Sequence, residues 1–416
     1  MKVVIASDAY FPMTNGVAVF AHNLAEGLAK RGHEVLVVCP SVTGRKHKRK
    51  DRKTGVTVFG LKSLRFPFYP DQIEKAPEAK KVLYKNGLWV AINPYHQIKK
   101  VLDSFQPDVI HLQTAGTIGI ATRMYVEKRK TPLVSTGHSY PDNFTGQFKI
   151  LKPVKKPVDK VTKNYLNSFL KHSDYATMPT EMAIEDLVPK NQKRFKVPVE
   201  PLSNGVDLAQ FSPGTPTPKV LKKYKIDPSR PRVIYVGRVD PEKSVEVVLN
   251  AFSKALLKVP DAEMLVVGDG IDKGRLEQKV KAEGLDGQIR FLGKIMPPEL
   301  QEVYRTGMVF ATASETETQG IVLIEAAATG LPLIAVDAGA IREVCRDKKN
   351  GFLCKPKDVT KIADAMIKIL TDKKLRKKFS AESLKISKEH DLNTTLKRFE
   401  EIYRKAIEIS SLRSRK

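Results

Sequence analysis

Short apolar runs alternate with longer amphipathic segments along the whole chain. In the first half, apolar runs at residues 3–6, 35–38, 56–59, 108–112, 133–136 and 175–178 predict buried strands. The segments between them predict helices, such as one over residues 17–30 that Gly32 ends. Apolar strands that alternate with helices are typical of a parallel sheet with helices on both faces.

The same alternation returns in the second half, after a stretch with the composition of a linker. Residues 205–231 hold five prolines together with glycine, serine and threonine. Further strands are predicted at residues 233–236, 264–267, 289–292, 308–313 and 333–336, and helices run from about residue 358. We therefore predict an α/β protein of two Rossmann-like domains, residues 1–205 and 206–390, that face each other across a cleft. Such sheets bind ligands at the carboxyl ends of their strands.

The composition is that of an ordinary globular enzyme. The 416 residues are 41% hydrophobic and 28% charged, and no apolar run reaches the roughly 18–20 residues that span a bilayer. No signal-peptide pattern precedes the first strand, and the three cysteines lie far apart, so we expect reduced thiols in a cytoplasmic protein. No CxxC or HxxxH spacing predicts a metal site.

The net charge of +26 is the unusual feature, and most of it lies in the first half. Residues 1–205 hold 33 basic and 17 acidic side chains. The clusters include a basic loop at residues 43–54, which we expect to be exposed and mobile, and a run at residues 152–163. Such a surface attracts an anionic membrane leaflet or a nucleic acid, although a solvated surface is equally consistent with the charge. No nucleic-acid-binding module is recognisable, so we expect no nucleic-acid partner.

The stretch from Glu317 to Glu325 combines features of an anion-binding and a sugar-binding site. It follows the predicted strand at residues 308–313 and opens a helix, whose first N–H groups suit an anion. Glu317, in the loop, would accept hydrogen bonds from sugar hydroxyls, and Glu325, on the helix, from both hydroxyls of a ribose. Alternatively, both are solvated glutamates of an amphipathic helix. The candidate donor-binding residues at the helix start are Gln319, Gly320, Ile321 and Val322.

Four separated motifs occur in order along nearly the whole chain. They are Asp8-Ala9-Tyr10-Phe11-Pro12 with Asn15-Gly16-Val17, Asn204-Gly205-Val206-Asp207 with Phe211, Gly237-Arg238 with Glu242-Lys243, and Glu317 with Glu325 followed by AAATGLP at residues 326–332. This set resembles the signature of the retaining GT-B glycosyltransferases of family four. The resemblance implies the GT-B fold and a last helix, about residues 391–416, that crosses back onto the first domain.

The resemblance also implies roles around a nucleotide-sugar donor. Arg238 and Lys243 flank a strand-to-helix turn, where two cations would neutralise the departing diphosphate. His138, at the carboxyl end of the strand at residues 133–136, would contact the donor sugar. Gly16 would let the backbone of the first domain approach the phosphate or the sugar. The alternatives are solvated cations, a structural histidine and a turn glycine. Further implied donor contacts are Gly268 and the main chain of Lys294 and Ile295.

The reaction that the resemblance implies is transfer of a hexose, expected to come from UDP-glucose, with retention of configuration. The departing phosphate oxygen would take the acceptor's proton, and Glu317 would position the sugar rather than act as a base. No Asp-x-Asp occurs, which is the motif that usually holds the metal in GT-A transferases, so we expect no metal and no other cofactor. The first loop lacks GxGxxG, which disfavours a nicotinamide dehydrogenase.

The acceptor is less defined by the sequence. Residues 64–70 mix aromatic side chains with a cation, and residues 85–100 hold apolar side chains between lysines, as an interfacial segment does. The apolar side chains of residues 85–100 could equally belong to the core. The sequence FPFYP at 66–70 resembles that of bacterial diacylglycerol glucosyltransferases, which implies 1,2-diacylglycerol as acceptor and peripheral binding to the inner face of the cell membrane. The candidate membrane and acceptor residues are Phe66, Phe68, Lys80, Lys81, Trp89, Lys99 and Lys100.

Two alternatives stay open at the level of sequence. One is an α-mannosyl- or glucosyltransferase that acts on phosphatidylinositol or on a soluble sugar. The other is a catalytically silent protein that binds a sugar nucleotide or a polyanion. The sequence does not define the oligomeric state.

Overall fold

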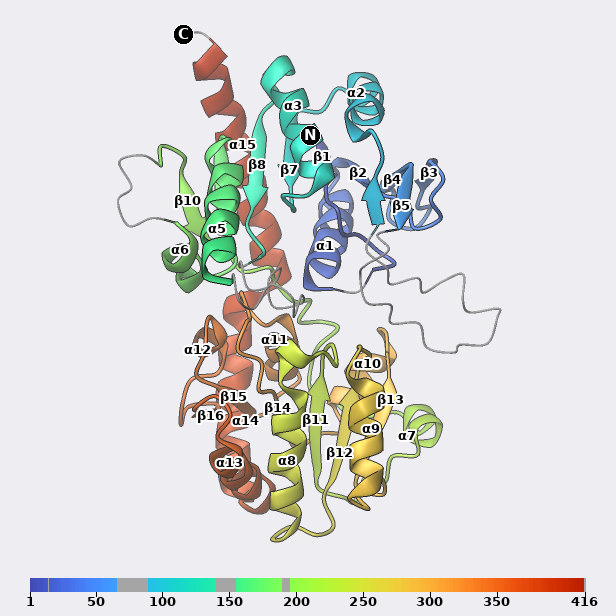
Figure 1. Ribbon diagram of the computed structural model, residues 1–416, viewed down its shortest axis with the longest axis vertical. Helices are drawn as coiled ribbons and strands as arrows, with labels where there is room; N and C mark the ends of the chain where they lie inside the picture. The colour runs from blue at the N-terminus through green and yellow to red at the C-terminus, as the bar shows by residue number, and fades with distance from the viewer. Residues whose placement is uncertain (14, 66–88, 140–154, 189–194, 415–416) are drawn as a thin grey trace. The chain divides into compact units, whose positions relative to one another are not determined.

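The computed structural model divides into two compact units. Unit 1 comprises Met1–Asn204 with Asn393–Lys416, and unit 2 comprises Gly205–Leu392. The residues that the structure does not describe are 14, 66–88, 140–154, 189–194 and 415–416. The domain limits predicted at residues 205 and 390 lie within two residues of this division. Each unit is a sheet with helices packed on it (Figure 1).

Unit 1 is built on an eight-stranded sheet in the order β10-β9-β8-β7-β1-β2-β4-β3. Its elements are β1 (Lys2–Ala6), α1 (Gly16–Lys30), β2 (Glu34–Pro40), β3 (His47–Lys50), β4 (Thr57–Leu61), β5 (Ser63–Arg65), β6 (Trp89–Ala91), α2 (Pro94–Phe105), β7 (Val109–Leu112), α3 (Thr117–Arg129), β8 (Leu133–Thr136), α5 (Lys155–Lys171), β9 (Tyr175–Met178), α6 (Glu181–Leu187), β10 (Val199–Pro201) and α15 (Leu392–Ser414). Strands β5 and β6 pair only with each other in the described part of the chain. The six apolar runs of the first half correspond to β1, β2, β4, β7, β8 and β9.

Strand β3 corrects the prediction of a mobile basic loop at residues 43–54. It pairs antiparallel with β4, in a register that places His47 opposite Gly60 and Lys50 opposite Thr57. The other strand pairs of this sheet are parallel. An edge strand needs only main-chain pairing on one side, and its exposed cations discourage pairing with other chains. The strand escaped prediction because its side chains show no apolar alternation.

The two faces of the unit 1 sheet pack against different helices. Val4 and Ile110, on one face, belong to a buried cluster with Ile98 of α2 and with side chains of α3 and α5. On the other face, α1 meets α15, and the rings of Phe20 and Phe399 lie 5.9 Å apart. Because consecutive strand residues point to opposite faces, a continuous apolar strand can serve both layers.

The C-terminal helix α15 is tied to the unit 1 sheet by a chain of buried hydrogen bonds. The Tyr403 hydroxyl lies 2.8 Å from His111 Nδ1, and His111 Nε2 lies 2.7 Å from Thr136 Oγ1. Thr136 Oγ1 in turn lies 2.7 Å from Thr177 Oγ1. Burial, with a smaller contribution from His138, lowers the pKa of His111 well below its usual range, so the ring is neutral. His111 is therefore a structural histidine that links a helix to three strands.

Unit 2 is built on a parallel six-stranded sheet in the order β13-β12-β11-β14-β15-β16. Its elements are α7 (Pro218–Tyr224), β11 (Arg232–Val236), η4 (Pro241–Lys243), α8 (Val245–Leu256), β12 (Glu263–Val267), α9 (Lys273–Ala282), β13 (Ile289–Gly293), α10 (Glu299–Tyr304), β14 (Val309–Ala311), α11 (Ile321–Ala328), β15 (Leu333–Val336), α12 (Ile341–Val344), β16 (Gly351–Cys354), α13 (Val359–Thr371), α14 (Lys373–Ser387) and η5 (Lys388–His390). Helix α8 packs beside α13, and α11 packs beside α14 (Figure 1). Helix α7 lies inside the stretch predicted as a linker, because Pro218 starts a helical turn and Val220 is buried in the unit's core.

In both units the strand order reverses beside the first strand. Strand β1 lies between β2 and β7, and β11 lies between β12 and β14. The loops at the carboxyl ends of such neighbours lead to opposite faces of the sheet, and this is the position at which open α/β sheets bind ligands. Three of the four motifs singled out in the sequence follow β1, β11 and β14, and the fourth, at residues 204–207, follows the edge strand β10.

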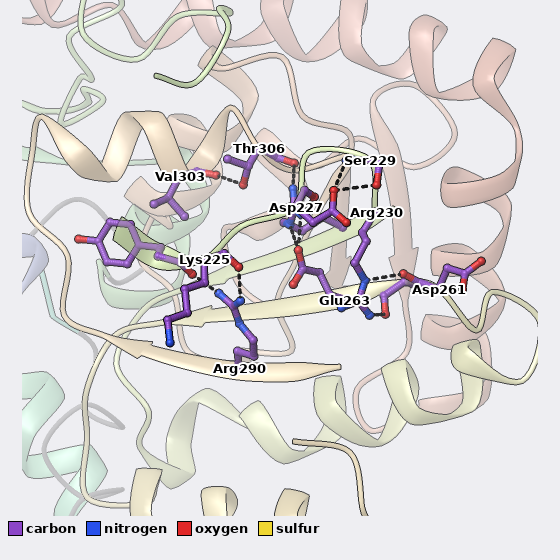
Figure 2. A network of polar contacts seen from close by, with 12 residues as sticks. Lys225, Asp227, Ser229, Arg230, Asp261, Glu263, Arg290, Val303 and Thr306 are labelled. Atoms are coloured by element: carbon purple, nitrogen blue, oxygen red, sulfur yellow. Dashed lines mark hydrogen bonds and ion pairs between the residues drawn. The ribbon is translucent and has the colours of Figure 1, made fainter. Parts of the chain in front are cut away.

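The opposite edge of the unit 2 sheet is fixed by an arginine network (Figure 2). The buried Arg232, at the start of β11, forms an ion pair with Glu263 at the start of β12. Arg230 and Arg290 donate to main-chain carbonyls, with Arg230 Nε 2.9 Å from the oxygen of Asp261. Removal of one partner of such a buried pair costs about 3–5 kcal/mol, because the other charge is left uncompensated. This edge is therefore held rigidly, while the carboxyl edge carries the loops of the candidate site.

Candidate active site

The loop after β11 holds Arg238 between two carboxylates. Its guanidinium forms ion pairs with Asp240 and Glu242. Asp240 Oδ1 also accepts a hydrogen bond from the N–H of Ile271 at 3.0 Å, which links this loop to the one after β12. The hydroxyl of Tyr235 donates to the carbonyl of Arg238 at 2.8 Å. The side chain of Arg238 is thus fixed at the carboxyl edge of the sheet and remains partly exposed.

Gly268 is required by the packing of two loops. Its φ is +142°, and a Cβ at this position would lie 1.8 Å from the carbonyl oxygen of Gly237. The loops after β11 and β12 can approach each other only because a side chain is absent here. This contact explains the glycine without a ligand, and its predicted contact with the donor stays a prediction.

Lys243, at the end of η4, meets Glu317 in the loop after β14. Lys243 Nζ lies 2.7 Å from Glu317 Oε1 and 3.4 Å from Ser314 Oγ. Burial pushes the pKa of Glu317 upward, but Lys243, Ser314 and the charge of Arg238 together outweigh it and hold the pKa below its usual value. Glu317 is therefore ionised at neutral pH. The structure brings these two predicted catalytic residues together where the strand order of unit 2 reverses.

Helix α11 begins beside this ion pair. Its N-cap, Gly320, has a φ of +76°, and a Cβ there would lie 2.5 Å from Leu323 Cδ1. The left-handed conformation is the reason for glycine at this position. The N–H groups of Ile321 and Val322 precede the first intrahelical hydrogen bonds, so they are the groups with which a helix binds an anion. Gln319, directly before the cap, is buried.

Glu325 lies in the interior of unit 2. Only 8% of the residue is exposed, and Oε2 accepts a hydrogen bond from the Tyr304 hydroxyl at 2.9 Å. Burial raises the pKa of Glu325 to about 7, although the hydrogen bond from Tyr304 acts in the opposite direction. The interpretation of Glu325 as a solvated glutamate is therefore wrong. A ligand that donates hydrogen bonds, such as a ribose diol, would stabilise the charged form.

The two residues predicted to contact the base follow β13 and are shielded from solvent. Ile295 belongs to the hydrophobic core of unit 2. Burial lowers the pKa of Lys294 to about 8, while the charge of Asp269 acts against this. A contact from the main chain of these residues to a base is compatible with buried side chains and stays a prediction.

In unit 1, the predicted residues Gly16 and His138 follow β1 and β8. Gly16 is exposed and begins α1, whose N-cap Asn15 accepts a first-turn N–H at 2.9 Å. His138 is half-buried, with Nε2 2.7 Å from Gln113 Oε1 and its ring 5.0 Å from that of Phe20. Burial lowers the pKa of His138 to about 3, so the imidazole is neutral. A neutral ring can orient a hydroxyl but does not supply positive charge.

Asp8, in the N-terminal motif, caps helix α3. Oδ1 accepts from Thr117 Oγ1 and from the N–H of Ile118, both at 3.1 Å. Oδ2 accepts from Thr114 Oγ1 at 2.7 Å. The carboxylate thereby satisfies groups at a helix start, and its place in the motif is explained by the fold.

The candidate membrane residues are described only in part. Those that lie outside the described residues are Phe66, Phe68, Lys80 and Lys81. Trp89 is only 8% exposed, which favours the alternative that its side chain belongs to the core over insertion into a membrane. Lys99 pairs with Asp103 at 2.6 Å, and Lys100 is exposed on α2. No helix in the described ranges combines the length and the apolar character needed to cross a bilayer.

Sequence reasoning missed three polar partners of the predicted residues. Gln113 is the first residue after β7. His138 was singled out because it lies at the carboxyl end of a strand, and the same criterion could have found Gln113. Asp240 lies inside a quoted motif, but an ion pair over two residues has no sequence signal. Tyr304, at the end of α10, looks like an ordinary core aromatic, and only the fold reveals that its hydroxyl reaches Glu325.

Two family models match this chain, and similar proteins are known. The model described as Glycosyltransferase Family 4 matches residues 14–210, and the model described as Glycosyl transferases group 1 matches residues 217–385. A GDP-mannose-dependent alpha-mannosyltransferase of Mycobacterium tuberculosis is 26% identical, over 85% of this chain and 83% of its own. An alpha-monoglucosyldiacylglycerol synthase of Streptococcus pneumoniae is 25% identical, over 85% and 75%. The structure of sucrose-phosphate synthase from Thermosynechococcus elongatus has a TM-score of 0.77 at 19% identity and covers 97% of this chain and 98% of its own.

Proposed function

Because this chain belongs to the glycosyltransferases of group 1 and family 4, we propose that it transfers glucose from UDP-glucose to 1,2-diacylglycerol, with retention of configuration, at an anionic membrane surface. The fold is GT-B, with two Rossmann-like domains, and the protein is a hexosyltransferase. The proposal for the donor substrate rests on one observation. Lys243 forms an ion pair with Glu317, beside Arg238 and the start of α11.

The cations at the carboxyl edge of unit 2 suit a departing nucleoside diphosphate. Arg238 and Lys243 are held in place by carboxylates, so they need no reorganisation when charge builds up on the phosphate. Fixed charges aimed at developing charge are the strongest kind of transition-state stabilisation. We propose that these cations and the first N–H groups of α11 carry out the neutralisation, and that the reaction needs no metal ion.

Glu317 acts as a positioning carboxylate in this proposal. Its low pKa and its bond to Lys243 make it a poor proton acceptor. The acceptor oxygen forms a bond to the anomeric carbon while the bond from that carbon to the phosphate oxygen breaks. The phosphate oxygen takes the acceptor's proton on the same face, so configuration is retained. Glu317 holds sugar hydroxyls, and Glu325 holds the ribose.

Two findings support a lipid acceptor. The relative from Streptococcus pneumoniae is named as a synthase of alpha-monoglucosyldiacylglycerol. The first 205 residues carry most of the net charge of +26, which favours an anionic leaflet. The reactive hydroxyl of a diacylglycerol lies at the level of the headgroups, so the enzyme would bind peripherally at the cytoplasmic face of the membrane.

Release of UDP tests the proposal directly. UDP-glucose is incubated with the protein and anionic liposomes that contain diacylglycerol, with liposomes that lack it, and with soluble sugars. We expect release only with diacylglycerol, and the same rate in excess EDTA. Release with a soluble sugar but not with the lipid would contradict the lipid acceptor, and loss of turnover in EDTA that Mg²⁺ restores would contradict the metal-free reaction.

A second candidate is an α-mannosyl- or glucosyltransferase for phosphatidylinositol or a soluble sugar. The similarity to a GDP-mannose-dependent alpha-mannosyltransferase favours it. The same assay with GDP-mannose, and with liposomes that contain phosphatidylinositol, distinguishes the two. Faster turnover of GDP-mannose than of UDP-glucose would support the second candidate.

A further inference from the structure

Gln113 is a buried polar residue at the place where the strand order of unit 1 reverses. It directly follows β7 and lies beside β1, where its N–H donates to the carbonyl of Ala6 at 2.9 Å. Only 1% of the residue is exposed. One amide atom, Oε1, lies 2.7 Å from His138 Nε2. The other, Nε2, is buried and has no hydrogen-bond partner among the described residues.

A buried amide donor without a partner is costly. It forfeits about 1–3 kcal/mol of hydrogen bonding that it had in water. The large majority of buried polar side-chain atoms do have a partner, so an exception needs an explanation. Packing alone does not explain it, because a methionine fills nearly the same volume without the cost. At this edge of an open α/β sheet, a bound ligand is the natural source of the missing acceptor.

The contact with Gln113 also sets the protonation of His138. The Oε1 atom of a glutamine can only accept, so His138 must carry its proton on Nε2. The ring is neutral, because burial lowers its pKa to about 3. Nδ1 therefore carries a lone pair. Gln113 Nε2 then remains as the donor of this pair that has no hydrogen-bond partner among the described residues.

We propose that Gln113 is a positioning residue of this transferase, which holds His138 in the Nε2-protonated form and donates its second N–H to a hydroxyl oxygen of a bound substrate. The inference rests on the proposed function, since that hydroxyl belongs either to the hexose of the donor or to the acceptor alcohol. A hydroxyl oxygen can accept this hydrogen bond and needs no positive charge beside it. A phosphate matches less well, because the neutral imidazole and the uncharged amide supply no positive charge.

Two substitutions separate the two roles. Gln113→Met keeps the shape of the side chain but removes both polar atoms. Gln113→Glu keeps an oxygen that accepts from His138 and removes the N–H that points to the substrate. We expect Gln113→Met to lose both the tautomer and the substrate contact, and Gln113→Glu to lose only the contact.

Nitrogen-15 NMR of the histidine-labelled protein reads the tautomer without any substrate. In the wild type and in Gln113→Glu, His138 is expected to be protonated on Nε2, whereas Gln113→Met is expected to show a mixture of both forms. His138→Gln identifies the signals of this ring by their disappearance. A wild-type ring protonated on Nδ1, or an unchanged tautomer in Gln113→Met, would overturn the pairing.

Transfer kinetics read the substrate contact. We expect kcat/KM to fall about tenfold or more in both variants. A rise in KM for the nucleotide sugar assigns the hydroxyl to the donor, and a rise for the lipid assigns it to the acceptor. The matched control is Thr122→Val in α3, which removes a buried hydroxyl that also lacks a hydrogen-bond partner among the described residues and should leave the kinetics unchanged.

Wild-type kinetics in a folded Gln113→Glu protein would overturn the substrate contact. A wild-type protein that shows no transfer at all would instead contradict the proposed function. In that case the NMR comparison still decides the pairing of Gln113 with His138, because it needs no substrate.

Discussion

We predict that Glu325 makes nucleotide binding sensitive to pH near neutrality. Its pKa of about 7 means that the carboxyl is mostly protonated at pH 6 and mostly ionised at pH 8. The ionised form accepts hydrogen bonds from both ribose hydroxyls more strongly than the protonated form, whose O–H is a donor and whose acceptor capacity is reduced. We expect the affinity for UDP to fall by up to about tenfold as the pH is lowered from 8 to 6, measured by calorimetric titration. Glu325→Gln corrects for titration of UDP itself, and an identical pH dependence in this variant would exclude Glu325 from the site.

The same residue should cost stability at neutral and alkaline pH. Its folded-state pKa lies above the usual value of 4.5, so the folded protein binds the proton more tightly than the unfolded chain does. Stability is therefore lost as the pH rises from about 4.5 to 7, by about 3 kcal/mol in total. We expect Glu325→Gln to unfold at a higher urea concentration than the wild type at pH 8, with a smaller difference at pH 4.5. Equal midpoints at pH 8 would show that the folded protein does not disfavour the charge.

Arg238 and Lys243 should act on the transition state rather than on the bound donor. The charge that they face grows as the phosphate departs, so Arg238→Ala and Lys243→Ala are each expected to lower kcat by about 10²–10³ and to raise KM far less. Steady-state kinetics with UDP-glucose measure both constants. Lys254→Ala on α8 is the control, because among the described residues the one hydrogen-bond partner of its ammonium is the hydroxyl of Thr360. An increase confined to KM would mean that the cations bind the ground state and transition state equally.

At the scale of elements, Gly268 is predicted to set the packing of two strand ends. Gly268→Ala would drive a Cβ into the carbonyl of Gly237, in a backbone conformation that L-residues rarely adopt, so it should destabilise the protein and weaken UDP binding. Gly274→Ala is the matched control: this glycine lies in helix α9, and a Cβ there meets nothing within 4 Å. It should stabilise the fold by about 0.5–1 kcal/mol. Thermal unfolding of both variants tests the contrast, and equal midpoints would contradict the packing argument.

Most of the strands that the sequence predicted are buried along nearly their whole length, and the edge strand β13, with one buried residue, is an exception. Strands such as β8 and β15 are buried along their whole length, and their apolar runs match the observed limits of both. The strands that escaped prediction are short or lie at sheet edges. Strand β3 is exposed on every residue, and β16 is a four-residue edge strand that begins with glycine. Main-chain hydrogen bonds hold such strands in place, and these bonds impose little pattern of apolar and polar residues on the sequence.

The candidate site was predictable to the extent that its residues come directly after the carboxyl ends of strands. Lys243 and Glu317 are 74 positions apart, yet the rule that ligands bind at the carboxyl edge placed both in one site, where they form an ion pair. The environment of each residue was not predictable. That Glu325 would be buried against Tyr304, or that Trp89 would be covered, depends on packing between elements distant in sequence.

At the scale of the whole molecule, most of the net charge of +26 lies in the first 205 residues. Among the described residues, this positive charge is most exposed on strand β3, where Lys48, Arg49 and Lys50 are consecutive and exposed. None of the three forms an ion pair within the described part of the chain. Lys99 is a weaker candidate than the sequence indicated, because Asp103 already neutralises it.

We predict that the basic face of unit 1 determines binding to anionic membranes. Each cation near an anionic surface contributes about 1 kcal/mol, so the triple variant Lys48→Glu, Arg49→Glu and Lys50→Glu should bind anionic liposomes about a hundredfold more weakly. The matched control reverses Lys374, Lys377 and Lys378 on α14 of unit 2, which are equally exposed and change the net charge by the same amount. Co-sedimentation at several salt concentrations measures binding, which should fall for the wild type as salt rises. UDP affinity should stay unchanged in both triple variants. If both triple variants lose binding equally, the net charge rather than β3 is responsible. A wild-type protein that does not bind anionic liposomes at low salt would contradict the membrane proposal and favour a soluble acceptor.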